Sequence, residues 1–230
     1  MQTKAIFQTP TTNLEASVNF YSRLGFERIE CEKRNIYTDG KAVVEINNHK
    51  YARKGIKLFS NNWTSVIKEL EKITPIHKTE EGYIAVDPNG VKVYLVSGEE
   101  YNISNDEKAF GLIGNFAGLS IETVDFNNSL SFWEILGYAI SNGGVEQGWM
   151  TLSAGNGIDI SVMKLESCPH SFSNPGLTYF NSGKNPEIIK KIREVKIPIS
   201  EEINCFNDKG IVDNIIIRDP GHTLFFIFND

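Results

Sequence analysis

The 230-residue sequence has few cysteines and no long hydrophobic run, and both shortages limit what the protein can be. Its three cysteines, Cys31, Cys168 and Cys205, are widely spaced and form no C-x-x-C pair. This pattern argues against a disulfide framework or a structural zinc knuckle and predicts reduced thiols. The longest apolar run lies near Leu224–Phe228, far short of the roughly 20 residues that a membrane-spanning helix needs.

No apolar segment follows the first residues, so we see no signal peptide and expect a cytoplasmic protein without a membrane partner.

Positive charge is scarce in the second part of the chain. Up to Phe110 there are 15 basic and 15 acidic residues, whereas the rest has 8 basic and 14 acidic residues and carries the whole net charge of −6. Because nucleic-acid binding needs clustered Lys and Arg, we expect no nucleic-acid partner.

Histidine is also scarce, and no Gly-rich phosphate loop, Ser-His-Asp ordering or nucleophilic-Cys signature occurs. None of the four histidines has another histidine four residues away or a carboxylate beside it. We therefore interpret them as surface or loop residues rather than metal ligands. What remains is an ordinary globular composition, 40% hydrophobic and 23% charged, long enough for one large or two modest domains.

The chain repeats itself, with a spacing of 112 residues between the two copies of a helical segment. Segment 13–26 (NLEASVNFYSRLGF) matches segment 125–138 (DFNNSLSFWEILGY), and a D-P turn at 87–90 is echoed at 219–222. Asn13 and Asp125 are good helix N-caps, apolar residues follow at helical spacing, and Gly25 and Gly137 stand where a helix would end. Each copy therefore predicts a helix with an apolar face packed in the core.

The pattern around these segments predicts an α+β fold in which the order βαβββ occurs four times. Strands are expected at 3–8, 26–32, 35–38, 41–47, 55–59, 76–79, 82–86 and 91–96, and then at 117–123, 138–141, 148–153, 158–163, 177–181, 199–206, 212–217 and 223–228. Further helices are expected at 64–73 and 186–195. We place a first module at 1–100, a linker at 101–114 and a second module at 115–230.

These marks resemble the vicinal oxygen chelate superfamily, which includes glyoxalase I, extradiol dioxygenases and bleomycin-resistance proteins. Segment 13–26 is similar to the family stretch D-L-x-x-S-x-x-F-Y-x-x-L-G-F, and D-P-N-G precedes the last strand of the first module. The resemblance implies two tandem glyoxalase-like modules. In each, a pair of βαβββ units forms a cupped mixed sheet with helices outside.

In the metal enzymes of this family, ligands lie on strands one, four, five and eight of a cup, as His or Gln and Glu, and hold Zn, Ni, Fe(II) or Mn. Counted from the motifs, these positions fall on Ile6, Glu45, about Ile56 and Tyr94 in the first module. In the second they fall on Gly118, Asp159, about Leu177 and Phe225. Only Glu45 and Asp159 have ligand chemistry, and a shift of two residues would add Gln8 or Ser120 but no histidine. We therefore predict no metal in the usual place and no cofactor, with a divalent metal kept as the alternative.

Strand alternation identifies the candidate ligand-binding residues. In the first cup these are Glu45, Tyr94, Ile6, Ile56 and Lys92, which together form a mostly apolar cleft. In the second they are Asp159, Phe225, Trp149 and Glu122, with Ile227 and Ser161 beside them. Glu45 is either a hydrogen-bonding or general-base carboxylate, or an acid satisfied by Tyr94 or Lys92.

Three functions follow from the resemblance and the missing ligands. The preferred hypothesis is a metal-free protein that binds a small aromatic or amphipathic molecule in a mostly apolar cup. The alternatives are a metal-dependent lyase, isomerase or dioxygenase with relocated ligands, and a non-catalytic interaction module with closed cups. Two modules in one chain can mimic a dimer of one-module proteins, so we expect a monomer or a homodimer.

Overall fold

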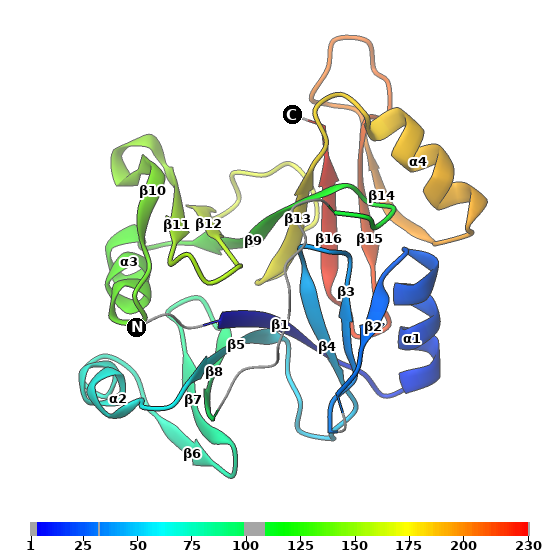
Figure 1. Ribbon diagram of the computed structural model, residues 1–230. Coiled ribbons are helices and arrows are strands. Elements are labelled where there is room, and N and C mark those ends of the chain that lie inside the picture. The colour runs from blue at the N-terminus through cyan, green and yellow to red at the C-terminus, as the bar shows by residue number, and fades with distance from the viewer. Residues whose placement is uncertain (1–3, 32, 99–108, 230) are drawn as a thin grey trace.

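The computed structural model describes residues 4–31, 33–98 and 109–229. Within them, sixteen strands form two eight-stranded mixed sheets, one for each half of the chain (Figure 1). The first sheet contains β1 (Lys4–Pro10), β2 (Glu27–Ile29), β3 (Ile36–Thr38), β4 (Val43–Asn47), β5 (Gly55–Ser60), β6 (His77–Thr79), β7 (Gly82–Val86) and β8 (Lys92–Ser97). The second contains β9 (Asn115–Thr123), β10 (Ala139–Gly144), β11 (Trp149–Ser153), β12 (Ile160–Lys164), β13 (Gly176–Phe180), β14 (Ile199–Ile203), β15 (Asn214–Arg218) and β16 (Leu224–Phe228).

The two sheets have the same strand order. It runs β2-β3-β4-β1-β5-β8-β7-β6 in the first and β10-β11-β12-β9-β13-β16-β15-β14 in the second. In the first sheet β1 pairs with β4 and β5 with β8 in parallel, while β1 and β5 meet antiparallel at the centre. Each half-sheet is thus one βαβββ unit, and the predicted fold, two tandem cupped modules of the α+β class, is confirmed.

The four helices are α1 (Leu14–Arg23), α2 (Thr64–Leu70), α3 (Phe126–Ile135) and α4 (Asn185–Glu194), with a short 3-10 helix, η1, at Val145–Gln147. The two repeat helices begin as predicted, because the Asn13 side chain accepts a hydrogen bond from Ala16 N and Asp125 accepts one from Asn128 N. Both end at a glycine with positive φ, Gly25 at +82° and Gly137 at +89°, which a residue with a Cβ adopts only at a cost.

The modules share one continuous hydrophobic core, which draws buried residues from both sheets and from the repeat helices. α1 packs on the second sheet, where the rings of Phe20 and Phe225 have centroids 5.8 Å apart. Figure 1 shows α1 next to α4 and α2 next to α3, so the helices of the two modules lie in pairs. Arg23 of α1 fixes the first pair by donating to the backbone carbonyl of Val195, at the end of α4.

Away from this shared core, each sheet has a second face with its own small apolar cluster. In the first module that cluster consists of Ile6, Ile36, Val43, Phe59 and Val96. In the second it consists of Ile203, Ile216, Leu224 and Phe226. These second faces are the concave faces of the two cups, called here the first cup and the second cup.

The expected linker 101–114 falls largely on residues 99–108, which lie outside the described part of the chain. The segment after residue 108 is tied to the first module, since Phe110 N donates to Asp39 O and Leu112 N donates to Leu24 O. Among the described residues, no helix has the length and apolar character needed to cross a membrane.

Candidate functional site

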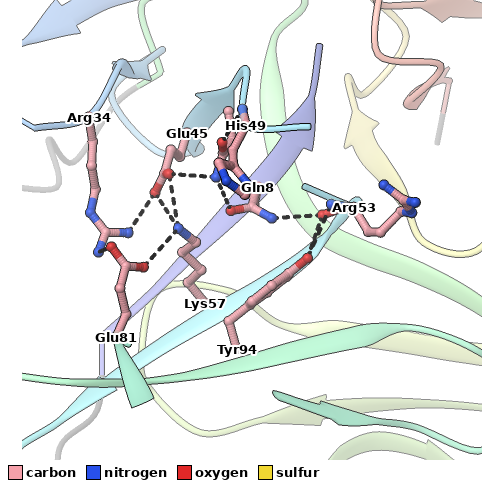
Figure 2. A network of polar contacts seen from close by, with 9 residues as sticks. Gln8, Arg34, Glu45, His49, Arg53, Lys57, Glu81 and Tyr94 are labelled. Carbon is pink, nitrogen blue, oxygen red and sulfur yellow. Dashed lines mark hydrogen bonds and ion pairs between the residues drawn. The ribbon is translucent and has the colours of Figure 1, made fainter. Parts of the chain in front are cut away.

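Four polar side chains from four central strands meet on the floor of the first cup. The sheet register pairs Gln8 of β1 with Glu45 of β4, and Lys57 of β5 with Tyr94 of β8. Ile6 pairs with Lys57, so the alternation of side chains places all of them on the concave face. Figure 2 shows Glu45, Lys57 and Gln8 pointing toward one another from neighbouring strands.

Lys57 and Glu45 form a buried ion pair at the centre of this floor. Lys57 Nζ donates to Oε1 and to Oε2 of Glu45, each at 2.9 Å, and the two residues are only 2% and 4% exposed. Burial lowers the pKa of Lys57, and the charge of Glu45 opposes that shift. A buried pair of this kind is tolerated only when its remaining donors and acceptors are also satisfied.

Two further charged residues close the arrangement into a ring. Arg34 donates to Glu45 Oε2 at 2.9 Å and to Glu81 Oε1 at 2.8 Å, and Glu81 Oε2 lies 3.8 Å from Lys57 Nζ (Figure 2). Two acids and two bases therefore alternate around the ring. Because each acid contacts both bases, no single charge on the floor is left without a counter-charge.

The other side of the floor is held by neutral hydrogen bonds. Gln8 Nε2 donates to the backbone carbonyl of Arg53 at 2.7 Å, and Gln8 Oε1 accepts from Asn47 Nδ2 at 2.9 Å. Tyr94 Oη donates to the same Arg53 carbonyl at 2.9 Å, and burial raises the pKa of its phenol. The ring of Tyr94 lies 5.7 Å from Lys57 Nζ, within the range of a cation–π contact.

Above this floor is a cavity of about 600 Å³, which is within the size range of small-molecule sites. Its wall adds the loop residues His49 and Tyr51 and the apolar side chain of Ile84 to the polar floor. Tyr51 is 69% exposed and its ring lies edge-on to His49, with centroids 5.6 Å apart. The cavity therefore combines an aromatic rim with a charged and fully hydrogen-bonded floor.

The structure places the predicted residues of the first cup unevenly. Glu45 and Tyr94 lie in the cavity wall, and Ile6 lies in the apolar cluster on the same face. The inward orientation expected for Ile56 is wrong, because Ile56 is buried in the shared core and its neighbour Lys57 faces the cup. Lys92 lines a separate cavity at the junction of the modules.

In the second cup the predicted orientation of Phe225 is wrong in the same way. Phe225, like Leu177 and Ile227, is buried in the shared core, whereas Phe226 belongs to the cluster on the concave face. The polar groups of that face at its centre are the hydroxyls of Ser120 and Thr178, 2.6 Å apart.

The remaining candidates of the second module are spread out. Asp159 precedes β12, and its backbone carbonyl accepts a hydrogen bond from the backbone N–H of Leu119, the residue after Gly118. Trp149, at the start of β11, is 43% exposed, and Ser161 pairs with Ser120 in the register of β12 and β9. Glu122 is buried at the end of β9, and burial raises the pKa of its carboxyl.

Aromatic side chains cover part of the second cup. His170, from the loop before β13, lies with its ring centroid 5.4 Å from that of Phe226 and 5.1 Å from that of Phe228. Phe172 stacks on Phe226 with centroids 4.8 Å apart. The two cups therefore differ in chemistry: the first has a charged floor under a cavity, and the second an aromatic cover over β16.

The donor set of the first cup does not fit a divalent metal. The four central strands supply one amide, one carboxylate, one ammonium and one phenol, and both oxygens of the carboxylate already bind Lys57. A transition-metal site takes three or four protein ligands, and a nearby ammonium repels a cation. In the part of the chain that the structure describes, no group of three or more His, Cys, Asp or Glu side chains could hold a metal ion.

Comparison with solved structures identifies the fold. A variant of homoprotocatechuate 2,3-dioxygenase from B. fuscum matches with a TM-score of 0.60 and 13% identity, over 99% of this chain and 70% of that one. A Mn(II)-bound glyoxalase from Novosphingobium aromaticivorans matches with a TM-score of 0.57 and 13% identity, over 97% and 80%. A halotolerant catechol dioxygenase matches with a TM-score of 0.52 and 13% identity, over 100% and 87%.

At this level of identity the likeness establishes the fold alone. It confirms the fold that the repeated motifs predict, two tandem modules, because these structures align with 99–100% of the chain. Neither protein-family models nor curated proteins give a match to the sequence.

Proposed function

We propose that the chain binds a small aromatic or amphipathic molecule in the first cup without using a metal ion. The observation that carries this proposal is the position of Lys57. Its ammonium lies on the fifth strand of the cup, where the family resemblance would draw a metal ligand, and it binds both oxygens of Glu45. The positive charge that a metal ion would bring is supplied by this side chain.

The walls of the cavity indicate the chemical character of the ligand. The exposed ring of Tyr51 and the half-buried ring of Tyr94 present aromatic surface, which favours a planar or apolar body. The charged ring on the floor favours a polar group that can accept from Arg34 or donate to Glu45. An amphipathic molecule with one flat side and one hydrogen-bonding end satisfies both.

Reversible binding needs no further group from the chain. Lys57, Glu45 and Arg34 are already bonded to one another, which suits a pre-organised binding surface. A free general base or nucleophile would instead require one of them to be released from its partner. The alternatives, a metal-dependent lyase, isomerase or dioxygenase and a closed interaction module, are outcomes that the tests distinguish.

The binding test uses 8-anilinonaphthalene-1-sulfonate, a fluorescent amphipathic aromatic anion, as the probe. We expect a saturable fluorescence increase at one site per chain, weakened by Tyr51→Ser, which removes the exposed rim aromatic. The matched control is Phe110→Ser, because Phe110 is also an exposed aromatic, 44% exposed, and does not line this cavity. Equal binding by Tyr51→Ser and wild type, or no saturable signal at all, would overturn the proposal.

A second set of probes determines which charge the cavity prefers at the polar end of the ligand. Benzoate, benzylamine and benzyl alcohol have the same ring and differ in charge, so their effects on the thermal unfolding midpoint can be compared directly. Arg34 is the base of the floor that comes from the loop between β2 and β3, and it favours benzoate over the other two. A rank order that is unchanged in Arg34→Gln would contradict this assignment of the polar end.

A further inference from the structure

A second cavity, of about 410 Å³, lies at the junction of the two modules and is lined by basic residues from both. Arg53, Lys54 and Lys92 come from the first module, on the segment before β5 and at the start of β8. Arg218 and His222 come from the second module, at the end of β15 and in the D-P turn that follows it. We call this the junction cavity.

The charge of the junction cavity is opposite to that of the protein as a whole. The chain has a net charge of −6, yet four Lys and Arg side chains converge here, and none of the described residues that line the cavity is acidic. Like charges placed this close repel one another, so the arrangement costs free energy unless a negatively charged group lies among them.

The nearest carboxylate does not neutralise the cluster, because it is buried and bonded elsewhere. Asp219 is 3% exposed, and its Oδ2 accepts from Thr9 Oγ1 at 2.7 Å and from Tyr21 Oη at 2.9 Å. Its Oδ1 accepts from the backbone N–H of Thr223 at 2.7 Å. The carboxylate therefore points into the core and not into the junction cavity.

Lys54 is partly buried in the junction cavity. Burial lowers its pKa to about 8, the charge of Asp219 partly opposes this, and the charge of Arg218 adds to the lowering. Its ammonium donates to the hydroxyl and the carbonyl of Ser173, so it is held across the junction between the modules. The positive charges that line the junction cavity would attract a negatively charged group at this position.

We propose that the junction cavity binds a compact multivalent oxyanion, the phosphate or pyrophosphate group of a small molecule. Two guanidinium groups and two ammonium groups match an oxyanion with several acceptor oxygens. The volume of about 410 Å³ fits such a group with a small organic part attached and excludes a folded partner. This site does not depend on the proposed function, since its cations are not those of the first cup.

The two modules contribute equally to this site, which explains why the sequence shows no phosphate motif. Gly90 ends one D-P turn and Lys92 follows it at the start of β8, whereas Gly221 and His222 belong to the other turn. The second turn packs tightly on the end of β1: a Cβ on Gly221 would lie 2.0 Å from the backbone oxygen of Pro10. The repeat thus brings two turns, 132 residues apart, to one place.

The test is isothermal titration of the full chain with sodium pyrophosphate at constant ionic strength. We expect saturable 1:1 binding, weakened about tenfold for each cation removed in Lys92→Gln and Arg218→Gln. The control, Lys68→Gln with Lys190→Gln, makes the same change in net charge on exposed faces of α2 and α4. Thermal unfolding of every variant checks that the fold is retained.

Two outcomes would overturn the proposal: absence of saturable heat in wild type, or equal weakening in the control. Inorganic phosphate and phenyl phosphate distinguish the two sources of the anion. Equal affinity for both assigns a free-anion site, and tighter binding of phenyl phosphate assigns a phosphate ester, and each supports an oxyanion site. The effect of uncharged benzyl alcohol on the thermal unfolding midpoint should be the same in Lys92→Gln, Arg218→Gln and wild type, which keeps this test separate from that of the first cup.

Discussion

Tyr21 donates a hydrogen bond from its phenol to Asp219 Oδ2 at 2.9 Å, and this bond joins α1 of the first module to the D-P turn of the second. Both residues are buried, and Thr9 shares the same carboxylate oxygen. A reciprocal contact joins α3 of the second module to the D-P turn of the first. Trp133, the repeat counterpart of Tyr21, lies beside Asp87 of that turn. The two repeated motifs are therefore joined to each other across the modules.

Replacement of Tyr21 by Phe tests this junction. The change removes one donor from a buried carboxylate and leaves the ring in place, so we expect a loss of about 1–3 kcal/mol in the free energy of unfolding. Denaturant unfolding measures it. The control is Tyr83→Phe, because the Tyr83 hydroxyl has no hydrogen bond to any described residue; it should cost about 0.5 kcal/mol or less. Equal losses in the two variants would contradict the role of the bond.

The pH dependence of Asp219→Asn gives a second prediction. Burial raises the pKa of Asp219 above its ordinary value, so the native state keeps the proton to higher pH than the unfolded state. The stability contributed by this group is therefore fully present below the unfolded pKa and is lost as the pH rises through the native pKa. The destabilisation caused by Asp219→Asn should then be largest at low pH and shrink as the pH rises. An increase with pH would contradict the raised pKa.

The buried ion pair of the first cup predicts a strong asymmetry between single and double substitution. Lys57→Met leaves Glu45 buried beside Arg34 alone, and we expect a loss of about 3–5 kcal/mol in the free energy of unfolding. The double variant Glu45→Leu with Lys57→Met removes both charges and should be more stable than either single variant.

An exposed ion pair provides the control for these variants. Lys72 and Glu69 are 60% and 50% exposed, so Lys72→Ala should cost less than about 1 kcal/mol. Chemical denaturation of the four variants and wild type gives the comparison. Additive losses in the double variant would show that Lys57 and Glu45 do not act as a pair.

The junction cavity predicts an affinity for pyrophosphate that falls as the pH rises from 7 to 9. Lys54, with its pKa lowered to about 8, loses its charge in this interval, while Arg53 and Arg218 keep theirs. Lys92 and His222 face the same cavity and Asp219 lies behind it, so the matched variant Lys54→Arg is needed to isolate the effect. Titration calorimetry at each pH should give a shallower fall in Lys54→Arg, and parallel curves would refute the assignment to Lys54.

The fold could be predicted from the sequence because its signals are local and occur twice. N-caps at Asn13 and Asp125, glycines at the ends of both helices and the two D-P turns fix the beginning and end of each unit. The arrangement of the strands in two cupped sheets is what the family resemblance implies. The sequence did not indicate η1, a local turn of three residues, or the extent of the shared core, which depends on contacts between residues distant in the chain.

The site could be predicted only in part. Glu45 and Tyr94 were located because their positions can be counted from a motif, whereas no motif stands next to β5, and the count fell one residue short of Lys57. In β16 the run from Leu224 to Phe228 is apolar on both faces, so alternation could not distinguish Phe225 from Phe226. Lys57 itself stands in an apolar run as a lone cation, a signal that could have identified it.

The most direct test of the central claim, a ligand cup that works without a metal ion, is the metal content of the protein itself. Wild type is incubated with Zn(II), Ni(II), Mn(II) and Fe(II) in turn, desalted and measured by mass spectrometry of the elements, with Glu45→Gln alongside. We predict far less than one metal ion per chain in every case, because Lys57 already occupies both oxygens of Glu45. One retained ion per chain in wild type, lost in Glu45→Gln, would contradict the account and assign the first cup to metal-dependent chemistry.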